Sequence, residues 1–256
     1  MEIATIDSII NKNKIDYKDI MENFVKWLTE AKYTPHGIVF DKGITCMEAI
    51  LRYRLEKNNP IDCGSKLINS NGNGSLMRML PIAYYCYYKK IDYEKIYEII
   101  KNVSSLTHAH EISILGCYIY VHYVLLLLKG NNKFSSYNKV KLIDYSKFDL
   151  KSLKVYSRFL KDDIKRFDIS DIKSSGYIVD SLEASMWVLL NTDNYKEAII
   201  NSINLGNDTD TIGAITGSMA GIIYGYNSMP KKWLAKLVKR QYLEELCDKF
   251  EKTICD

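Results

Sequence analysis

Apolar residues recur at helical spacing along most of this chain, and that periodicity limits the fold more than any other feature. A clear case lies early in the sequence, where Ile15, Ile20, Phe24 and Leu28 share one face of a helix. No run of six or more residues alternates well enough to form a sheet strand. The pattern predicts an all-α protein. The helices are expected over residues 15–27, 45–55, 76–88, 93–103, 110–128, 179–190, 195–203, 211–224 and 231–250.

The region from 130 to 175 shows the weakest periodicity and is rich in Lys, Asp and Ser. Only its portion from Val155 to Phe167 favours a helix. We interpret 130–175 as an irregular excursion, either on the surface or as a hinge between groups of helices. No strong boundary and no repeat of fixed period divides the 256 residues, so a single domain is predicted over 1–256.

Composition and charge argue against several classes of protein. The hydrophobic content of 47% is typical of a soluble globular chain, and the net charge of +4 comes from scattered lysines. Without an arginine-rich patch, no nucleic-acid partner is expected. The longest apolar stretches, Ile112–Leu128 and Ile212–Tyr224, contain polar residues and predict buried helices, not membrane spans. Six cysteines without a CxxC pair, and a start unlike a signal peptide, predict a reduced intracellular compartment.

The most informative segment is 205–213, which concentrates oxygen-bearing side chains. The carboxylates of Asp208 and Asp210 and the hydroxyl of Thr211 offer three hard ligands within four residues. Such ligands suit Mg²⁺, Mn²⁺ or Ca²⁺ better than Zn²⁺ or Cu⁺. In the alternative interpretation, the two aspartates only cap the following helix.

Glycine stands at every fourth position after the acidic cluster, at 213, 217, 221 and 225. This spacing places the glycines on one face of a helix, where a neighbouring backbone can approach closely. The cluster therefore lies at or just before a helix N-terminus, where the helix dipole favours carboxylates.

A second segment, Asn71-Gly72-Asn73-Gly74-Ser75, predicts a loop that can adopt positive φ and then enters a helix. Backbone amides at such a point can bind an anion or a phosphate. Arg78 could pair with a phosphate or with a carboxylate of the protein. The loop could equally be a simple turn.

A third segment, 104–111, holds His108, His110 and Glu111, which suggests metal binding or acid–base chemistry. Zinc is not expected, because the spacing is not HExxH and two histidines two residues apart face different sides of a helix. Thr107 could instead be a helix N-cap. His122, inside an apolar helix, is predicted to be a core histidine with satisfied hydrogen bonds.

Together these segments resemble the ADP-ribosylglycohydrolase family. The motifs stand in the family's order and cover nearly the whole chain. They are Asn73-Gly74-Ser75-Leu76-Met77-Arg78 with Pro81, Ser105-Leu106-Thr107-His108, Gly176-Tyr177-Ile178-Val179-Asp180-Ser181-Leu182 with Ala184 and Trp187, and Leu205 to Thr211 with the glycine helix, Pro230 and Trp233.

The resemblance implies an orthogonal bundle of helices around a cleft with two Mg²⁺ (Mn²⁺ in some members). It also implies hydrolysis, in the cytoplasm, of the bond between ADP-ribose and a protein side chain or small acceptor. By position, Asp208, Asp210 and Thr211 are similar to metal ligands. Substrate-binding residues by the same resemblance are Asn73, Gly74, Ser75, Thr107 and His108, with the asparagine–glycine turn opposite the aspartates.

The sequence departs from the family pattern at its start. Relatives carry an early Gly-Asp-Ala-Xaa-Gly helix and a Thr-Asp-Asp-Thr motif, and neither is found in this chain. Residues from Met1 to Ser8 resemble the helix that follows Thr-Asp-Asp-Thr. We therefore expect an N-terminally incomplete domain, with the catalytic carboxylates missing before Met1 and the catalytic residues unassigned.

Three ligands from one segment leave a hard cation short of roughly six oxygens, so weak metal binding and impaired hydrolysis are expected. Two alternatives stay open. The chain could be a non-enzymatic relative that binds ADP-ribose or has a structural role, or an unrelated helical protein with a Ca²⁺-dependent interaction. The expected partner is an ADP-ribosylated protein or a small ADP-ribosyl compound, with no membrane involved.

Overall fold

The computed structural model describes residues 1–255, which contain fourteen α-helices and no β-strand. The helices are α1 (Glu2–Lys12), α2 (Tyr17–Glu30), α3 (Ile44–Glu56), α4 (Leu80–Tyr88), α5 (Tyr93–Ser105), α6 (Glu111–Leu128), α7 (Lys133–Val140), α8 (Leu150–Val155), α9 (Ser157–Lys161), α10 (Ile178–Leu190), α11 (Tyr195–Asn204), α12 (Thr209–Tyr224), α13 (Lys231–Leu234) and α14 (Arg240–Cys255). The all-α prediction is confirmed.

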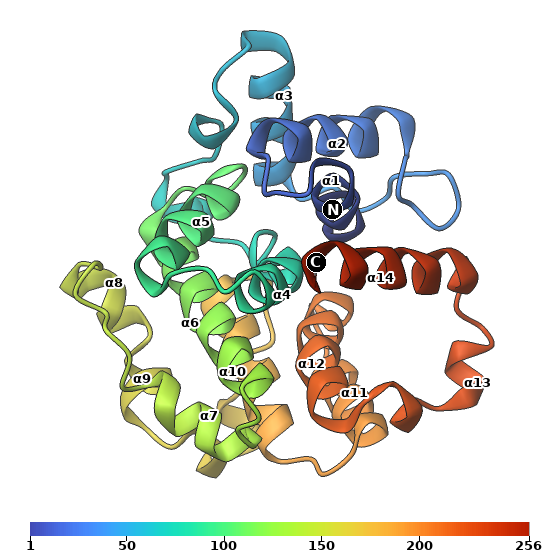
Figure 1. Ribbon diagram of the computed structural model, residues 1–256. Helices are drawn as coiled ribbons and strands as arrows, with labels where there is room; N and C mark the ends of the chain where they lie inside the picture. Colours follow the sequence, from blue (N-terminus) through green and yellow to red (C-terminus); the bar gives the residue numbers. More distant parts are fainter. Residues whose placement is uncertain (256) are drawn as a thin grey trace.

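Helix α6 forms the centre of the larger helical group, with α4, α5, α7, α8, α10 and α12 packed against it (Figure 1). It has the length and apolar composition of a membrane span, yet 83% of it is buried inside the protein. No other helix within residues 1–255 passes that test. The burial is what a core helix shows, and the apolar residues of α6 account for much of the main core cluster.

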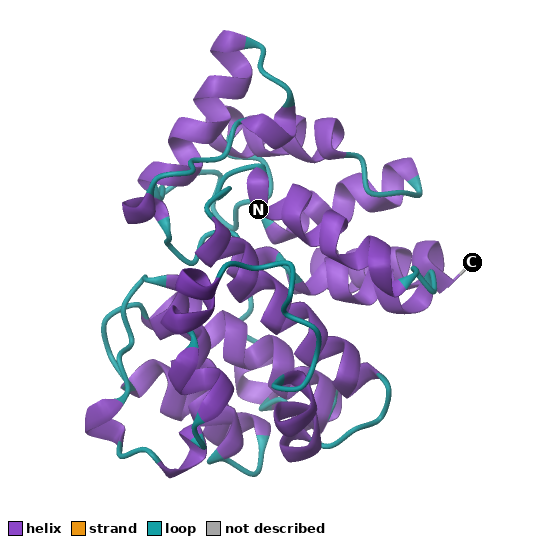
Figure 2. Ribbon diagram, turned by 90° about the vertical axis from the view of Figure 1, so that its left-hand side faces the viewer, coloured by secondary structure: helices purple, strands orange, loops and turns teal. Residues whose placement is uncertain are grey.

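The helices near the N-terminus, α1 to α3, form a smaller group with its own apolar cluster, which includes Ile20, Phe24 and Ile50. Helix α14 packs against α1 and α4, so that the last helix joins the first one (Figure 1). Figure 2 shows the same two groups from the side, with the α1–α3 group above the bundle around α6. The two ends of the sequence thus meet beside α4.

Two predicted helices have different bounds in the structure. The one expected at 76–88 starts as a 3₁₀ turn, Leu76–Arg78, and becomes α4 only at Leu80, because Pro81 is tolerated only in a first helical turn. The helix expected at 231–250 is broken between α13 and α14. Lys239 has φ of 56° there, a left-handed conformation that no α-helix continues through.

Region 130–175 carries three short helices, α7 to α9, and two 3₁₀ turns. Four of its aromatic side chains are buried in the main core cluster: Tyr137, Phe148, Tyr156 and Phe159. The Tyr156 hydroxyl donates to the Ile112 carbonyl at the start of α6 (2.9 Å). Aromatic anchors therefore hold this lysine-rich region against the central helix.

Candidate functional site

Three segments that are distant in the sequence meet at the start of α12. They are the loop 71–75, the segment 174–181 that leads into α10, and the segment 207–211; we call this meeting point the α12 junction. The Asn73 amide hydrogen-bonds the Gly176 carbonyl (2.9 Å), and the Asp208 amide hydrogen-bonds the Ser174 carbonyl (3.1 Å). Backbone hydrogen bonds thus fix the segment 174–181 between the other two.

Asp208 occupies the N-cap position of α12, but its side chain makes no capping hydrogen bond. Its Oδ2 atom instead accepts a hydrogen bond from Asn73 Nδ2 at 2.6 Å. The alternative interpretation, in which this aspartate serves only as a helix cap, is therefore wrong for Asp208. The asparagine–glycine turn is in direct contact with the aspartate rather than across a cleft from it.

Asp210 and Thr211 lie in the first turn of α12. Asp210 is exposed, and no side chain within residues 1–255 forms an ion pair with it. Thr211, by contrast, is buried, with 8% of the residue exposed. The two carboxylates thus differ: that of Asp208 is held by the protein, and that of Asp210 is free in solvent.

Helix α12 packs against α11 through Gly213 and Gly217, two of the four glycines at the predicted spacing, whereas Gly225 lies just beyond the helix. A Cβ atom on Gly213 would lie 3.3 Å from Ile203, and one on Gly217 would lie 3.0 Å from Ile199. Both isoleucines belong to α11. The two helices therefore approach closely along this face, which fixes the N-terminal turn of α12 relative to the rest of the bundle.

The side chain of Asn73 is buried and uses both of its amide hydrogens. One goes to Asp208 Oδ2 and the other to Ser181 Oγ (2.8 Å). Only its Oδ1 atom remains for a ligand. Gly74 leaves room for neighbouring side chains, because a Cβ there would lie 2.8 Å from Cys46 Sγ and 3.0 Å from the His108 ring. The glycine serves internal packing as well as loop conformation.

Ser75 and Arg78 point into the protein. Ser75 is fully buried with its hydroxyl 3.4 Å from Cys117 Sγ, so it offers no polar atom to a ligand in this conformation. Arg78 is 0% exposed and donates to the carbonyls of Gly74 (2.6 Å) and Val103 (3.1 Å). The expected pairing of Arg78 with a phosphate or carboxylate is not observed. The guanidinium instead fastens the loop to the end of α5.

Thr107 and His108 lie in the turn between α5 and α6. The Thr107 hydroxyl is fully buried and hydrogen-bonds His108 Nδ1 (2.7 Å), so Thr107 is not a helix cap. The cap of α6 is His110, whose Nδ1 accepts from the Ile112 amide (3.2 Å). Burial, reinforced by the positive charge of Arg78, lowers the pKa of His108 to about 3. The His108 ring is therefore neutral at pH 7.

Asp208, Asp210 and Thr211 provide the free donor atoms at the start of α12. They are all oxygens, and the Asp208 Oδ1 atom and the Asp210 carboxylate make no hydrogen bond to the chain over residues 1–255. No group of three His, Cys, Asp or Glu residues with metal-binding geometry occurs in the same residues. The set therefore suits Mg²⁺ or Mn²⁺ but leaves most coordination positions to water.

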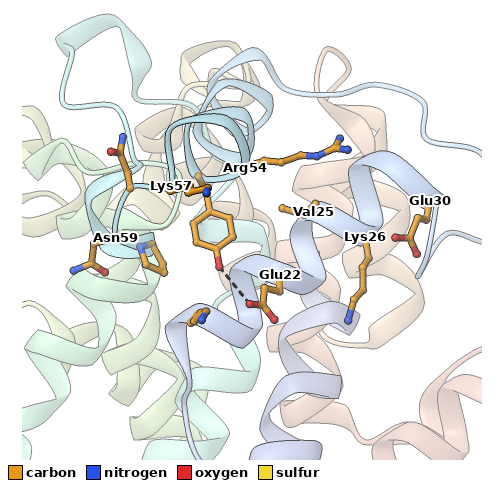
Figure 3. A pocket seen from close by; sticks show the side chains of 11 residues that line it. Glu22, Val25, Lys26, Glu30, Arg54, Lys57 and Asn59 are labelled. Atoms are coloured by element: carbon orange, nitrogen blue, oxygen red, sulfur yellow. Dashed lines mark hydrogen bonds between the residues drawn. The ribbon is translucent and has the colours of Figure 1, made fainter.

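Prominent hollows lie elsewhere on the molecule. One of about 720 Å³ lies between α2 and α3, and charged side chains of both signs line it, among them Glu22, Lys26 and Arg54 (Figure 3). Another, of about 960 Å³, lies between the 31–36 turn and the 236–243 segment. None of their lining residues belongs to the α12 junction, so the site is recognised by its chemistry and not by a large cavity.

Sequence analysis assigns no role to two residues that contact the site residues. Ser181 belongs to the motif 176–182, and its hydroxyl accepts a hydrogen bond from the Asn73 side chain. Gly176 lies against Asp208, since a Cβ there would stand 3.2 Å from Asp208 Oδ2. His122 is buried as predicted, but its Nε2 atom has no hydrogen-bond partner, so the expectation of a satisfied histidine is wrong.

The order of motifs, the helical fold and the α12 junction can be compared with known proteins. The sequence matches the ADP-ribosylglycohydrolase family over residues 1–255. The chain belongs to this family. An ADP-ribosylarginine hydrolase of Serratia proteamaculans is 28% identical over 97% of this chain. An ADP-ribosyl-[dinitrogen reductase] glycohydrolase of Rhodospirillum rubrum is 29% identical over 93% of it.

This ADP-ribosylglycohydrolase family member spans 64% of the length of the Serratia protein and 71% of that of the Rhodospirillum protein. A solved ADP-ribosylglycohydrolase-related protein complex has a chain of similar fold, with a TM-score of 0.80 and 20% sequence identity. The likeness covers 99% of this chain and 79% of the other. It confirms the helical bundle that the resemblance implied.

Proposed function

We propose that this chain hydrolyses the glycosidic bond between ADP-ribose and a protein side chain or small acceptor, and that the reaction depends on Mg²⁺ or Mn²⁺. Family membership supports the reaction, and relatives named for ADP-ribosylarginine and for ADP-ribosyl-dinitrogen reductase support a modified protein as substrate. The observation in the chain that carries the proposal is the Asp208 carboxylate, which is turned from its own helix toward Asn73.

The cation would be held by Asp208, Asp210 and Thr211. A bound divalent cation would polarise a substrate oxygen or lower the pKa of a water molecule. The three side chains belong to the N-cap and first turn of α12, where the helix dipole favours negative charge. It also leaves Asp210 open to solvent, which gives an approaching cation a route to the site.

ADP-ribose would lie against the loop 71–75 and the turn at Thr107 and His108. The neutral His108 ring holds its Nδ1 atom in the hydrogen bond with Thr107, so its Nε2 atom is the one left for a ligand. A Cβ on Gly72 would stand 3.6 Å from that Nε2 atom, which places it beside the loop. Thr107 and Ser75 would act by supporting their neighbours.

We further propose that hydrolysis by this chain is slow. A hard cation takes roughly six oxygens or more, and the segment 207–211 supplies three ligand side chains, Asp208, Asp210 and Thr211. Water must fill the other positions, so cation affinity falls. Hydrolysis also requires a carboxylate that activates water against the anomeric carbon. Asp180 is the one carboxylate of the junction outside the segment 207–211, and it accepts a hydrogen bond from the Ser175 hydroxyl (2.6 Å).

Release of free ADP-ribose from an arginine-modified or serine-modified peptide tests the proposal. We expect slow release with Mg²⁺, none with EDTA, and none from Asp208→Ala or Asp210→Ala. Asp168→Ala is the matched control, since Asp168 is an exposed aspartate whose side chain makes no hydrogen bond within residues 1–255. Release that persists in EDTA would contradict metal dependence. Binding of ADP-ribose without any release would favour the non-enzymatic relative.

A further inference from the structure

The Asp208 carboxylate is the end of a hydrogen-bonded chain that starts on α10. The Ser181 hydroxyl donates to the Ser175 carbonyl (2.9 Å) and accepts from Asn73 Nδ2 (2.8 Å). The same nitrogen donates to Asp208 Oδ2 (2.6 Å). We propose that Asn73 is a positioning residue, which fixes Oδ2 of Asp208 and thereby presents Oδ1 to the cation. The role of the cation rests on the proposed function; the role of Asn73 in orienting Asp208 does not.

The contacts around Asn73 restrain its hydrogen bond with the Asp208 carboxylate. An N–H donor to an ionised oxygen makes a shorter and stronger bond than one to a neutral oxygen, and burial strengthens it further. The Asn73 amide group cannot rotate away, because its second hydrogen is bonded to Ser181 and its backbone N–H is bonded to Gly176 (2.9 Å). Gly176 itself lies against Asp208 Oδ2, which blocks the carboxylate on a further side.

Asn71, two residues earlier, shows what an asparagine does in the same loop without such a role. Its Nδ2 donates to the Ile68 carbonyl (2.8 Å), and its Oδ1 accepts from Ser113 Oγ (2.8 Å). Both asparagines are buried and both contact a fully buried serine. Only the pair Asn73–Ser181 leads to Asp208. Ser113→Ala is therefore a matched control for Ser181→Ala, because each removes one buried hydroxyl bonded to a loop asparagine.

The orientation of Asp208 can be measured without metal. In protein labelled with ¹³C at the aspartate carboxyl carbon, the Asp208 resonance is assigned as the one lost in Asp208→Asn. We expect Asn73→Ala and Ser181→Ala to shift this resonance, the first more than the second, and Ser113→Ala to leave it in place. An unmoved resonance in Asn73→Ala, or an equal shift in the two serine variants, would overturn the positioning role.

Mn²⁺ affinity, followed by electron paramagnetic resonance of the free ion, links the orientation to binding. Loss of an outer-shell partner weakens metal binding by about 10–100-fold, and we expect a loss of that order in Asn73→Ala. We expect a smaller loss in Ser181→Ala and unchanged affinity in Ser113→Ala. Unchanged affinity in Asn73→Ala would contradict the proposal. If the wild-type chain binds no Mn²⁺, the metal part of the proposed function fails, and the carboxyl resonance alone decides the role of Asn73.

Discussion

The starts of α6 and α12 both carry a polar N-cap residue, yet the two side chains do opposite things. At α6, the His110 ring accepts a hydrogen bond from the Ile112 amide and so stabilises its own helix. At α12, the Asp208 carboxylate makes no such bond and reaches Asn73, which lies 135 residues away in the sequence. One side chain serves local structure, and the other is directed to a long-range contact.

The two helix starts differ in what the N-cap side chain stabilises. A capping side chain contributes about 0.5–2 kcal/mol to helix stability, which α12 gives up at Asp208. The Asp208 carboxylate instead accepts a hydrogen bond from Asn73 within the α12 junction. Asp92, at the N-cap of α5, also makes no capping bond, so what sets Asp208 apart is its hydrogen bond to Asn73 in a distant segment.

The largest expected effect is the response to acid of the turn before α6. Burial lowers the pKa of His108, in the turn before α6, from 6.5 to about 3. Between these values the unfolded chain binds a proton that the folded chain does not, so the free energy of unfolding falls as pH decreases from 6.5 toward 3. From pH 7 to pH 5 His108 should account for about 2 kcal/mol of this fall.

Urea unfolding at the two pH values measures this contribution. His108→Gln should lose less stability on acidification than the wild-type chain, by that same amount. His36→Gln is the control, because His36 is exposed and should leave the pH dependence unchanged. If the free energy of unfolding of His108→Gln fell as much as that of the wild-type chain, the buried ring would not be the group that gains a proton on unfolding.

Substitutions of two glycines test the comparison, because Gly64 lies near the start of α6 and Gly176 near the start of α12. A Cβ on Gly64 would stand 2.3 Å from the Ser105 carbonyl oxygen, in the segment that leads to His108. Such overpacking costs about 1–3 kcal/mol, so Gly64→Ala should lower the midpoint of urea unfolding. A Cβ on Gly176 would meet only Asp208 Oδ2, at 3.2 Å.

Gly176→Ala should therefore weaken Mn²⁺ affinity with little change in stability, and Gly64→Ala should show the reverse. Both variants are measured by urea unfolding and by Mn²⁺ titration. If each variant lost stability and Mn²⁺ affinity in the same proportion, the effect on Mn²⁺ binding would reflect general destabilisation and not a local change at the α12 junction.

The smallest expected effect concerns the caps themselves. His110→Ala should reduce hydrogen-exchange protection in the first turn of α6, because loss of a cap costs about 1 kcal/mol. Asp208→Ala should leave the protection of the Ile212 amide unchanged, since its partner is the Asp208 backbone carbonyl (3.1 Å). Reduced protection at Ile212 in Asp208→Ala would show that this carboxylate does stabilise its helix.

Helical spacing of apolar residues predicted α2 to α6 and α10 to α12, but not α1 or the short helices α7 and α8. It could not locate the break between α13 and α14, where the apolar pattern continues past Lys239 although the backbone turns left-handed. It also placed the start of α4 too early, since the Asn–Gly loop passes through a 3₁₀ turn before Pro81.

The sequence singled out Asp208 and Asn73 but not the partners of their side chains. Asp208 and the asparagine–glycine loop were expected close together only through the family resemblance, since helical periodicity says nothing about contacts between distant segments. Asn73 donates to Ser181, and Arg78 donates to two backbone carbonyls. These pairings depend on how the side chains pack, which the spacing of apolar residues does not encode. His110 as a cap was missed because histidine is not among the favoured N-cap residues.

Crystals soaked in MnCl₂ and measured for anomalous scattering test the central claim most directly. The account predicts a manganese peak at the first turn of α12, within coordination distance of Asp208 Oδ1 and the Asp210 carboxylate, with waters filling the other positions. It also predicts that Asp208 Oδ2 stays bonded to Asn73. A manganese peak elsewhere, or none at this turn at millimolar Mn²⁺, would contradict the assignment of these aspartates to a metal site.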